Sequence, residues 1–464
     1  MTDLLVRGGT VVTAAGTRRA DVAVTAGRIE AVGEGLSDGE ARSPREVIDA
    51  DGLLVLPGCV DVHTHTRVAS DAEPDRFFRD SVAAAFGGTT TFLAFNNPGT
   101  GVSEAGARSL LVGRDEFRAR TADDSAVDFG LSAVLSGQQT DPIAELPELI
   151  ESGVPSFKAF MVYDFRLPDE LLFAAMRLAA THRGLVQVHC ENATIIDALV
   201  VRELAAGNSG PRGHAASRPP YAEAEATHRA AALARAAGAS MHVVHLSCAD
   251  ALAEVRAAKA AGVAVSAETC PHYLTLTDER YDDPDPALAI RAVISPPLRS
   301  AGDRDALWAG LADGSLDLVA TDHVPDRLAV EKRLPAPPFD RISNGGPGIE
   351  TLLTLLYSEG VARGRLTLER MVELLATTPA RRFGLAAKGA VEPGRDADLV
   401  LFDPDARRTI RQAELHHTSD FTPYEGIEVM GAVRTVLVRG RPVVRDGRFV
   451  GQRGWGRFVE RRLD

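Results

Sequence analysis

The chain of 464 residues is too long for one ordinary hydrophobic core, which predicts one large domain accompanied by a smaller one. Its hydrophobic content of 45% and charged content of 25% are typical of a soluble globular protein. The net charge of −13, without any long basic stretch, argues against nucleic acid as a partner.

The four cysteines lie far apart in the sequence, and none forms a Cys-x-x-Cys pair. They are Cys59, Cys190, Cys248 and Cys270. We expect them to be buried, reduced thiols rather than disulfides. The N-terminus has no basic region followed by an apolar signal core, and no apolar run approaches the length of a membrane span. These features predict a cytoplasmic protein without a membrane partner.

Both ends of the chain show short alternating strands separated by glycines. Residues 1–55 contain "LLVRGGTVV", "ADVAVTAGRIEAVG" and "EVIDADGLLVLPG", and residues 391–445 continue the style with "GRDADLVLFDP" and "RTVLVRGRPVVRDGRFVG". This pattern is typical of a β-meander. We therefore predict that the two ends pair into one small, discontinuous β-sandwich domain, with residues 56–390 inserted between them.

The inserted region alternates apolar strand patterns with helical patterns. One helical pattern is the alanine-rich "AEAEATHRAAALARAAG", which Gly238 would end. Such alternation indicates a parallel sheet that is buried on both faces. An open doubly wound sheet is disfavoured because no G-x-G-x-x-G turn follows a strand. Eight strands close a (β/α)₈ TIM-like barrel, and we predict them at residues 59–63, 90–95, 128–134, 156–161, 185–190, 241–246, 263–268 and 316–322.

Polar side chains recur at the carboxyl ends of these predicted strands, where barrel enzymes carry their chemistry. The first strand ends in "HTH", whose two histidines would point the same way. One such histidine pair by itself is more often a hydrogen-bonded core pair, but six groups at one rim have the composition of a metal site. The six candidate ligands are His63, His65, Lys158, His189, His245 and Asp322.

Lys158 is unusual in this set because an ammonium has no lone pair and repels cations. It could instead be a buried lysine paired with an acid, or a lysine that forms a Schiff base. A neutral lysine amine can also capture CO₂ as a carbamate, and the two oxygens of this anion could bridge two metal ions.

A series of motifs, in order along the chain, resembles one enzyme family. They are "PGCVDVHTH", "AAAFGGTTT", "SFKAFMVY", "VHCEN", "SRPPYAEAEATHRA", "VHLSCADAL", "ETCPHYL", "SPPLR", "VATDH", "NGGPGIE", "DADLVLFDP", "FTPYEG" and "GWGRFVERR". The chain resembles the cyclic amidohydrolases, and within them the hydantoinase/dihydropyrimidinase group. The resemblance covers nearly the whole chain.

The resemblance implies a binuclear centre of two divalent metal ions, most simply Zn²⁺, and the hydrolysis of a cyclic amide to an N-carbamoyl amino acid. It implies that one metal is bound by His63, His65 and Asp322, that the second is bound by His189 and His245, and that N-carboxylated Lys158 bridges them. A hydroxide between the two metals would then be the nucleophile.

The same resemblance assigns further residues. Asp322 would act as general base and acid, and Tyr163 would hydrogen-bond the substrate carbonyl and its oxyanion. Ser295 and Asn344 match the positions whose backbone groups hold the cyclic amide. His323 either supports a metal ligand or makes a structural hydrogen bond.

The sequence departs from the group in three places. Thr66 and Arg67 follow the histidine pair, and H-x-H-x-R resembles dihydroorotases, in which the arginine binds the substrate carboxylate. The loop "FNNPGTG" at Phe95 resembles dihydroorotases and allantoinases, and "TDHVPD" lacks the Cys-Pro-Phe of many dihydropyrimidinases. An anionic or ureido cyclic amide bound by Arg67 is therefore an alternative substrate, unless Arg67 is a surface arginine of the loop.

Two other expectations concern partners. Non-catalytic scaffold proteins share this fold but lack the metal ligands, whereas here every expected ligand position is filled. The family resemblance implies a homo-oligomer, either a tetramer or a dimer. The tail at residues 446–464 would suit an arm that reaches across a subunit boundary, or it is a disordered terminus.

Overall fold

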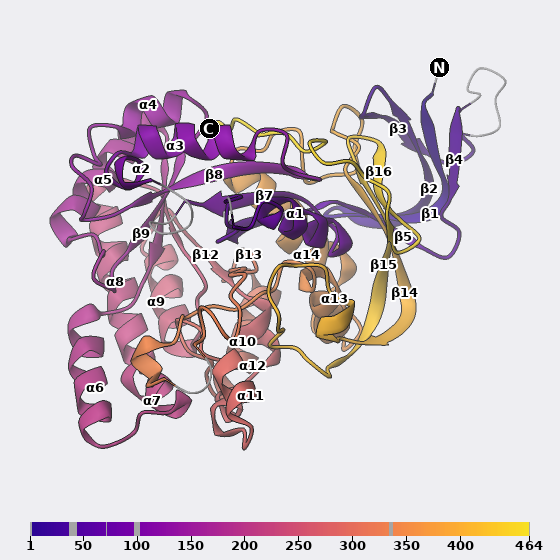
Figure 1. The fold of residues 1–464 in the computed structure, drawn as a ribbon. Helices are drawn as coiled ribbons and strands as arrows, with labels where there is room; N and C mark the ends of the chain where they lie inside the picture. The colour runs from indigo at the N-terminus through magenta and orange to yellow at the C-terminus, as the bar shows by residue number, and fades with distance from the viewer. Residues whose placement is uncertain (1, 37–43, 71, 97–102, 334–336, 464) are drawn as a thin grey trace.

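The computed structural model describes residues 2–36, 44–70, 72–96, 103–333 and 337–463. These residues form two parts, a barrel surrounded by helices and a long sheet beside it (Figure 1). The expected fold class is confirmed, while the predicted domain boundaries after residues 55, 390 and 445 stay predictions.

The barrel has eight parallel strands, and one lies in each of the eight predicted runs. They are β6 (Cys59–Thr64), β7 (Thr89–Phe95), β8 (Asp128–Leu135), β9 (Ser156–Phe160), β10 (Leu185–His189), β11 (Met241–Val243), β12 (Val265–Thr269) and β13 (Leu318–Val319). Their spatial order follows the chain from β6 to β13. A parallel bridge between Thr64 and His323, with His65 N donating to His323 O at 2.8 Å, closes the barrel.

Helices cover the outside of the barrel (Figure 1). The α-helices are α1 (Arg76–Phe86), α2 (Glu104–Arg108), α3 (Leu110–Thr121), α4 (Leu146–Glu151), α5 (Asp169–His182), α6 (Ala193–Ala205), α7 (Pro211–Ser217), α8 (Pro220–Ala237), α9 (Ala249–Ala260), α10 (Pro271–Thr275), α11 (Pro286–Arg291), α12 (Ala301–Asp313), α13 (Leu352–Leu356), α14 (Leu368–Val372) and α15 (Thr378–Arg382). Shorter 3₁₀ or π segments are η1 (Asp278–Asp282), η2 (Phe339–Arg341), η3 (Tyr357–Val361), η4 (Glu373–Thr377) and η5 (Gln412–Glu414). As predicted, α8 ends at Gly238, whose φ of 63° is left-handed. No helix of the described ranges has the length and apolar character that a membrane span requires.

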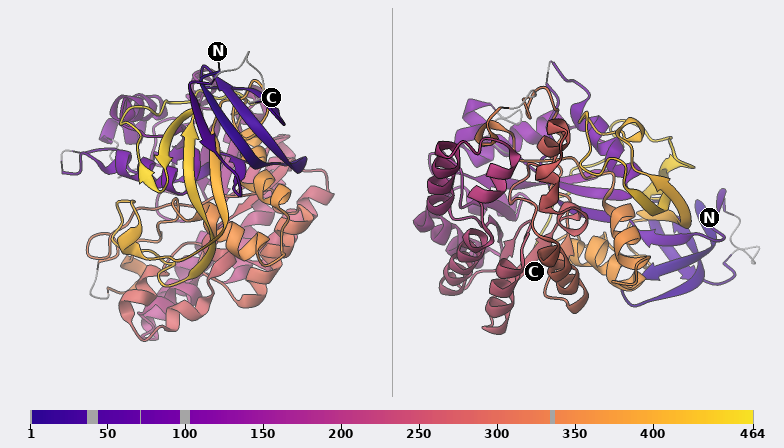
Figure 2. Two further views of the ribbon diagram at one scale, coloured as in Figure 1. Left: turned by 90° about the vertical axis from the view of Figure 1, so that its right-hand side faces the viewer. Right: turned by 90° about the horizontal axis from the view of Figure 1, so that it is seen from below.

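The two chain ends do pair, and they form one continuous nine-stranded sheet. Its strands are β1 (Leu4–Thr13), β2 (Gly16–Thr25), β3 (Arg28–Gly33), β4 (Glu46–Asp49), β5 (Leu54–Pro57), β14 (Leu399–Thr409), β15 (Glu428–Val438), β16 (Arg441–Arg445) and β17 (Arg448–Phe449). Antiparallel pairing of β5 with β14 joins the ends, so that N-terminal and C-terminal strands lie side by side in Figure 2. The sheet has its own apolar core, which combines residues of both ends such as Leu4, Val22, Leu399 and Leu437.

The C-terminal tail packs against the barrel of its own chain. Val459 N donates to Phe129 O at 2.7 Å, and the side chain of Arg461 is buried, with its guanidinium 2.9 Å from Ser156 Oγ. In Figure 1 the tail runs from the sheet back over the barrel. The described tail residues are therefore neither disordered nor directed away from the molecule, whereas the expected reach across a subunit boundary stays a prediction.

A buried lysine ties the sheet to the barrel. Lys388 Nζ lies 2.6 Å from Asp128 Oδ2, at the start of β8, and 2.7 Å from Asp398 Oδ2, next to β14. Asp396 Oδ2 is 3.0 Å from the same ammonium. These three carboxylates are close enough to hold a cation, and the ammonium of Lys388 fills that role.

Candidate metal centre

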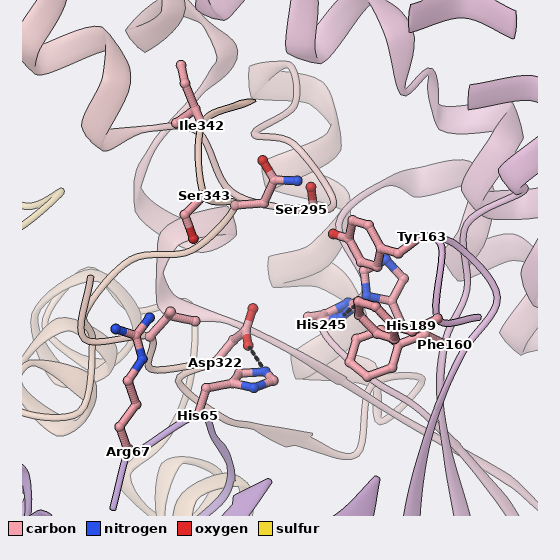
Figure 3. Close-up of a pocket in the computed structure, with 13 residues that line it drawn as sticks. His65, Arg67, Phe160, Tyr163, His189, His245, Ser295, Asp322, Ile342 and Ser343 are labelled. Carbon is pink, nitrogen blue, oxygen red and sulfur yellow. Dashed lines mark hydrogen bonds and ion pairs between the residues drawn. The ribbon is translucent and has the colours of Figure 1, made fainter. Parts of the chain in front are cut away.

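The six predicted ligand residues come together inside the mouth of the barrel. Asp322 Oδ1 is 3.0 Å from His63 Nε2 and 3.2 Å from His65 Nε2. Lys158 Nζ is 3.3 Å from the same His63 nitrogen. On the other side, His189 Nδ1 and His245 Nε2 are 2.9 Å apart, and ligand atoms of His63, His245 and Asp322 all lie within 4.8 Å of one another. Figure 3 shows four of these residues facing one space.

The sequence predicted that Lys158 lies at the end of its strand, but the residue lies in the middle of β9. It is the third of the five residues of β9, whereas His189 is the last residue of β10. The lysine side chain is long enough to extend from the middle of the strand towards the barrel mouth, so its nitrogen still reaches His63. His245 and Asp322 lie just beyond β11 and β13.

Three residues of this region have left-handed backbone conformations. The φ angles are 41° at His245, 49° at Asp322 and 76° at Tyr163. Residues with side chains rarely adopt this region, at a cost of about 1–3 kcal/mol each, and such strain gathers at functional sites. The fold holds these three side chains where an unstrained strand end would not place them.

Burial favours the neutral form, which ligation needs, in three of the four candidate histidines, whereas Asp322 and Glu268 raise the pKa of His63 despite its burial. The pKa of His65 is lowered to about 4 by burial, and burial also lowers the pKa values of His189 and His245. Neutral imidazole has the lone pair that binds a metal. For Asp322, burial alone would raise the pKa, but His63 and His65 hold it well below its usual value, which keeps the carboxylate ionised.

Glu268, at the fourth position of β12, orients His63 and was not selected from the sequence. Its Oε1 accepts a short hydrogen bond from His63 Nδ1, and its Oε2 is 2.9 Å from His242 Nε2. The pKa of Glu268 is about 2, because His63 and His242 outweigh the effect of burial. With Nδ1 committed to a carboxylate, Nε2 of His63 is left facing the cluster, as in the carboxylate–histidine pairs of metal sites.

Glu191 orients His189 in the same way as Glu268 orients His63. It was not selected from the sequence either, although the motif "VHCEN" contains it. His189 Nε2 lies 2.6 Å from Glu191 Oε2, which also accepts from Arg218 at 2.6 Å. This arrangement leaves Nδ1 of His189 facing His245. A signal was present in the sequence, because a carboxylate two residues after a candidate ligand is well placed to orient it.

The surroundings of Lys158 argue against one of the three roles that the sequence left open. Its side chain is wholly buried, and no described carboxylate lies within ion-pair distance of Nζ, which is against a lysine–acid pair. Burial lowers the pKa of Lys158 to about 8, while Asp322 and Glu268 act in the opposite direction. The neutral amine that carbamate formation needs is therefore accessible near neutral pH.

A cavity of about 310 Å³ opens beside this cluster. It is lined by His65, Arg67, Phe160, Tyr163, Phe165, His189, His245, Ser295, Asp322, Val324, Ile342, Ser343 and Asn344 (Figure 3). The predicted substrate-binding residues thus share one cavity with four of the six predicted ligands. Burial raises the pKa of the Tyr163 phenol, so Tyr163 stays a proton donor. The volume suits a small ring compound.

Arg67 lines the cavity, but its guanidinium is already paired. One terminal nitrogen is 2.6 Å from Asp326 Oδ1 and the other is 2.5 Å from Glu331 Oε1. Only 17% of its side chain is exposed, so Arg67 is not the surface arginine of the alternative interpretation. The loop at 97–102, which carries most of "FNNPGTG", lies outside the described residues.

His323 has a structural role in the barrel. Its carbonyl accepts the hydrogen bond from His65 N that closes the barrel, and its Nδ1 accepts from Gly348 N at 3.2 Å. Its Nε2 lies 3.8 Å from the buried Asp80 carboxylate. These contacts agree with the structural hydrogen bond of the sequence analysis.

An eight-stranded barrel with histidines, a lysine and an aspartate at its mouth defines a class of metal-dependent hydrolases. A sequence model of the amidohydrolase family matches residues 54–443, and the chain belongs to this family. It is 40% identical over 464 residues to a D-hydantoinase of Streptomyces coelicolor, covering 98% of this chain and 97% of that one. It is 38% identical to a D-phenylhydantoinase of Escherichia coli, over 99% and 98% of the two chains. The crystal structure of dihydropyrimidinase from Brevibacillus agri superposes with a TM-score of 0.93 at 40% identity, covering 100% and 99% of the two chains. The resemblance seen in the motifs is confirmed.

Proposed function

We propose that this protein hydrolyses a cyclic amide of the hydantoin or dihydropyrimidine type to an N-carbamoyl amino acid. The convergence of all six candidate ligands at the barrel mouth, with four of them lining one cavity, carries the proposal. The relatives named D-hydantoinase, D-phenylhydantoinase and dihydropyrimidinase support this substrate class.

The donor set fits two divalent cations of borderline softness, for which Zn²⁺ is our proposal. They would be held by His63, His65 and Asp322, by His189 and His245, and by N-carboxylated Lys158 between them. Bound cations of this kind lower the pKa of water from about 15.7 to about 7 and polarise a carbonyl.

The chain's own groups then handle the proton and the substrate. Asp322 is ionised, so it can accept the proton of the attacking water and return it to the leaving ring nitrogen. The protonated phenol of Tyr163 can donate to the oxygen that becomes negative when the carbonyl is attacked. Backbone groups of Ser295 and Asn344, which line the same cavity, would hold the ring amide.

The pairing of Arg67 bears on the choice of substrate. Because Asp326 and Glu331 already neutralise its guanidinium, the cavity offers no free cation at this place for a substrate carboxylate. This favours a neutral ring over the dihydroorotase-like alternative. An allantoinase-like ureido substrate carries no charge and stays an alternative.

The experiment is a rate comparison of hydantoin, a 5-substituted hydantoin, dihydrouracil, allantoin and dihydroorotate with metal-loaded enzyme. We expect the highest kcat/KM on a hydantoin or dihydrouracil. Lys158→Ala should lose activity and at least one of two metal ions per chain. Lys259→Met is the control, because Lys259 pairs with Asp317 at 2.7 Å outside the cavity, and it should keep both metal ions. A wild type without bound metal or turnover would point to the scaffold alternative.

Two further expectations from the sequence are part of the proposal. All four cysteines are buried and unpaired, which supports a reducing, cytoplasmic location. The homotetramer, or dimer, rests on the family resemblance alone, and sizing of the native protein by light scattering would test it.

A further inference from the structure

Lys332 is wholly buried behind the cavity, and its ammonium binds backbone rather than acid. Nζ donates to Val293 O and to Ser343 O, each at 2.7 Å. Among the described residues no carboxylate lies within ion-pair distance of it. A single side chain thus links two segments that are 50 residues apart in the sequence.

The two linked segments are the ones expected to hold the ring amide. Ser295 lies two residues after Val293, Asn344 directly follows Ser343, and Ser295, Ser343 and Asn344 all line the cavity. Figure 3 shows Ser295 and Ser343 on the same wall of the cavity. Lys332 does not line the cavity itself, so it links the two segments without facing the cavity.

The segment around Ser295 is also held by two other buried side chains. His214 Nε2 lies 2.8 Å from Ile294 O, and Tyr273 Oη donates to Pro296 O at 2.6 Å. The backbone carbonyls on either side of Ser295, those of Ile294 and Pro296, are thus each held by a buried side chain. The segment at Ser343 is also held by its backbone, because Ser343 N donates to Glu331 O at 3.3 Å. Lys332 adds a direct side-chain link between this segment and the one at Ser295.

The burial of an ammonium is unfavourable unless hydrogen bonds or an opposite charge compensate for its lost hydration. Burial lowers the pKa of Lys332 to about 8, although Asp326 acts in the opposite direction. A hydrophobic side chain of similar length would fill the same space without this cost. The ammonium contributes two short hydrogen bonds to backbone carbonyls, which a methionine side chain cannot form.

We propose that Lys332 is a positioning residue that sets the spacing of the Ser295 and Asn344 segments, and thereby the affinity for the cyclic amide. It touches neither the substrate nor the candidate metal ligands, so its loss should affect substrate binding more than the chemical step. The inference rests on the proposed function, because substrate binding is what it explains.

The test compares steady-state constants of Lys332→Met, Lys332→Gln and the wild type on the best cyclic amide. We expect KM to rise at least tenfold in Lys332→Met, with kcat within threefold and metal content unchanged. Lys332→Gln, whose amide can still reach one carbonyl, should show a smaller rise. Lys259→Met is the matched control, because Lys259 also donates to a backbone carbonyl, Ser315 O at 2.9 Å, but away from the cavity. Its KM should equal that of the wild type.

A KM within twofold of the wild type in both folded Lys332 variants overturns the inference, whatever happens to kcat. If neither variant folds, Lys332 serves the fold as a whole, and the inference is likewise wrong. A wild type that turns over no cyclic amide contradicts the proposed function and the inference with it. An active wild type with unaffected Lys332 variants contradicts the inference alone.

Discussion

Glu268 offers a sharp test of the metal centre, because it touches the ligand His63 without facing the cavity. Replacing it by glutamine keeps the volume but removes the charge, and puts an NH₂ group where one of two imidazole nitrogens needs an acceptor. Both carboxylate oxygens are used, Oε1 by His63 and Oε2 by His242 at 2.9 Å, so no rotation of the amide can satisfy both partners.

The expected size of the effect follows from this geometry. Loss of a carboxylate that orients a ligating histidine typically lowers metal affinity about 10–100-fold, or about 1.4–2.8 kcal/mol. Glu268 is wholly buried, and both of its carboxylate oxygens are bonded to imidazole nitrogens. We therefore expect Glu268→Gln to lie towards the upper end of that range.

The assay is a titration of metal-loaded protein with a competing chelator, followed by elemental analysis. Glu254→Gln is the matched control, since Glu254 pairs with His228 at 2.8 Å on the exposed surface. Activity of Glu268→Gln should recover when excess metal is supplied. If Glu268→Gln binds both ions as tightly as the control does, the argument that Glu268 orients His63 for metal binding is wrong.

Three other predictions concern single side chains. Tyr163→Phe should keep both metals and lose about 10²–10³-fold in kcat, as when an oxyanion donor is removed; a loss below threefold would exclude that role. Arg67→Leu leaves the buried Asp326 without its partner, so we expect about 2–3 kcal/mol less stability in urea but an unchanged rate ratio of hydantoin to dihydroorotate; a tenfold change in that ratio would restore the carboxylate-binding role. Burial lowers the pKa of His417 to about 3. Because only the unfolded chain then takes up this proton below about pH 6.5, the wild type should lose about 1 kcal/mol more than His417→Gln between pH 7 and 5.5; parallel pH profiles would contradict this.

The sequence by itself determined the barrel and its candidate ligands. Runs such as "LVQVH" and "SFKAF" carry apolar residues on both faces, and this pattern predicted buried parallel strands without knowledge of distant contacts. Because parallel strands bring their carboxyl ends to one rim, a linear list of strand ends already gave His63, His189 and Asp322 as neighbours.

Only the tertiary structure decided which groups support those ligands and which charges remain free. Glu268 and Arg67 show why: their partners His63 and Asp326 lie about 200 residues or more away in the sequence. Hydrogen bonds between distant residues leave no periodic trace in a sequence, because they depend on side-chain direction at the ends of different strands. The arginine that the sequence suggested as an anion receptor is neutralised by such contacts, and Lys332, which no motif singled out, joins the two segments of the cavity wall.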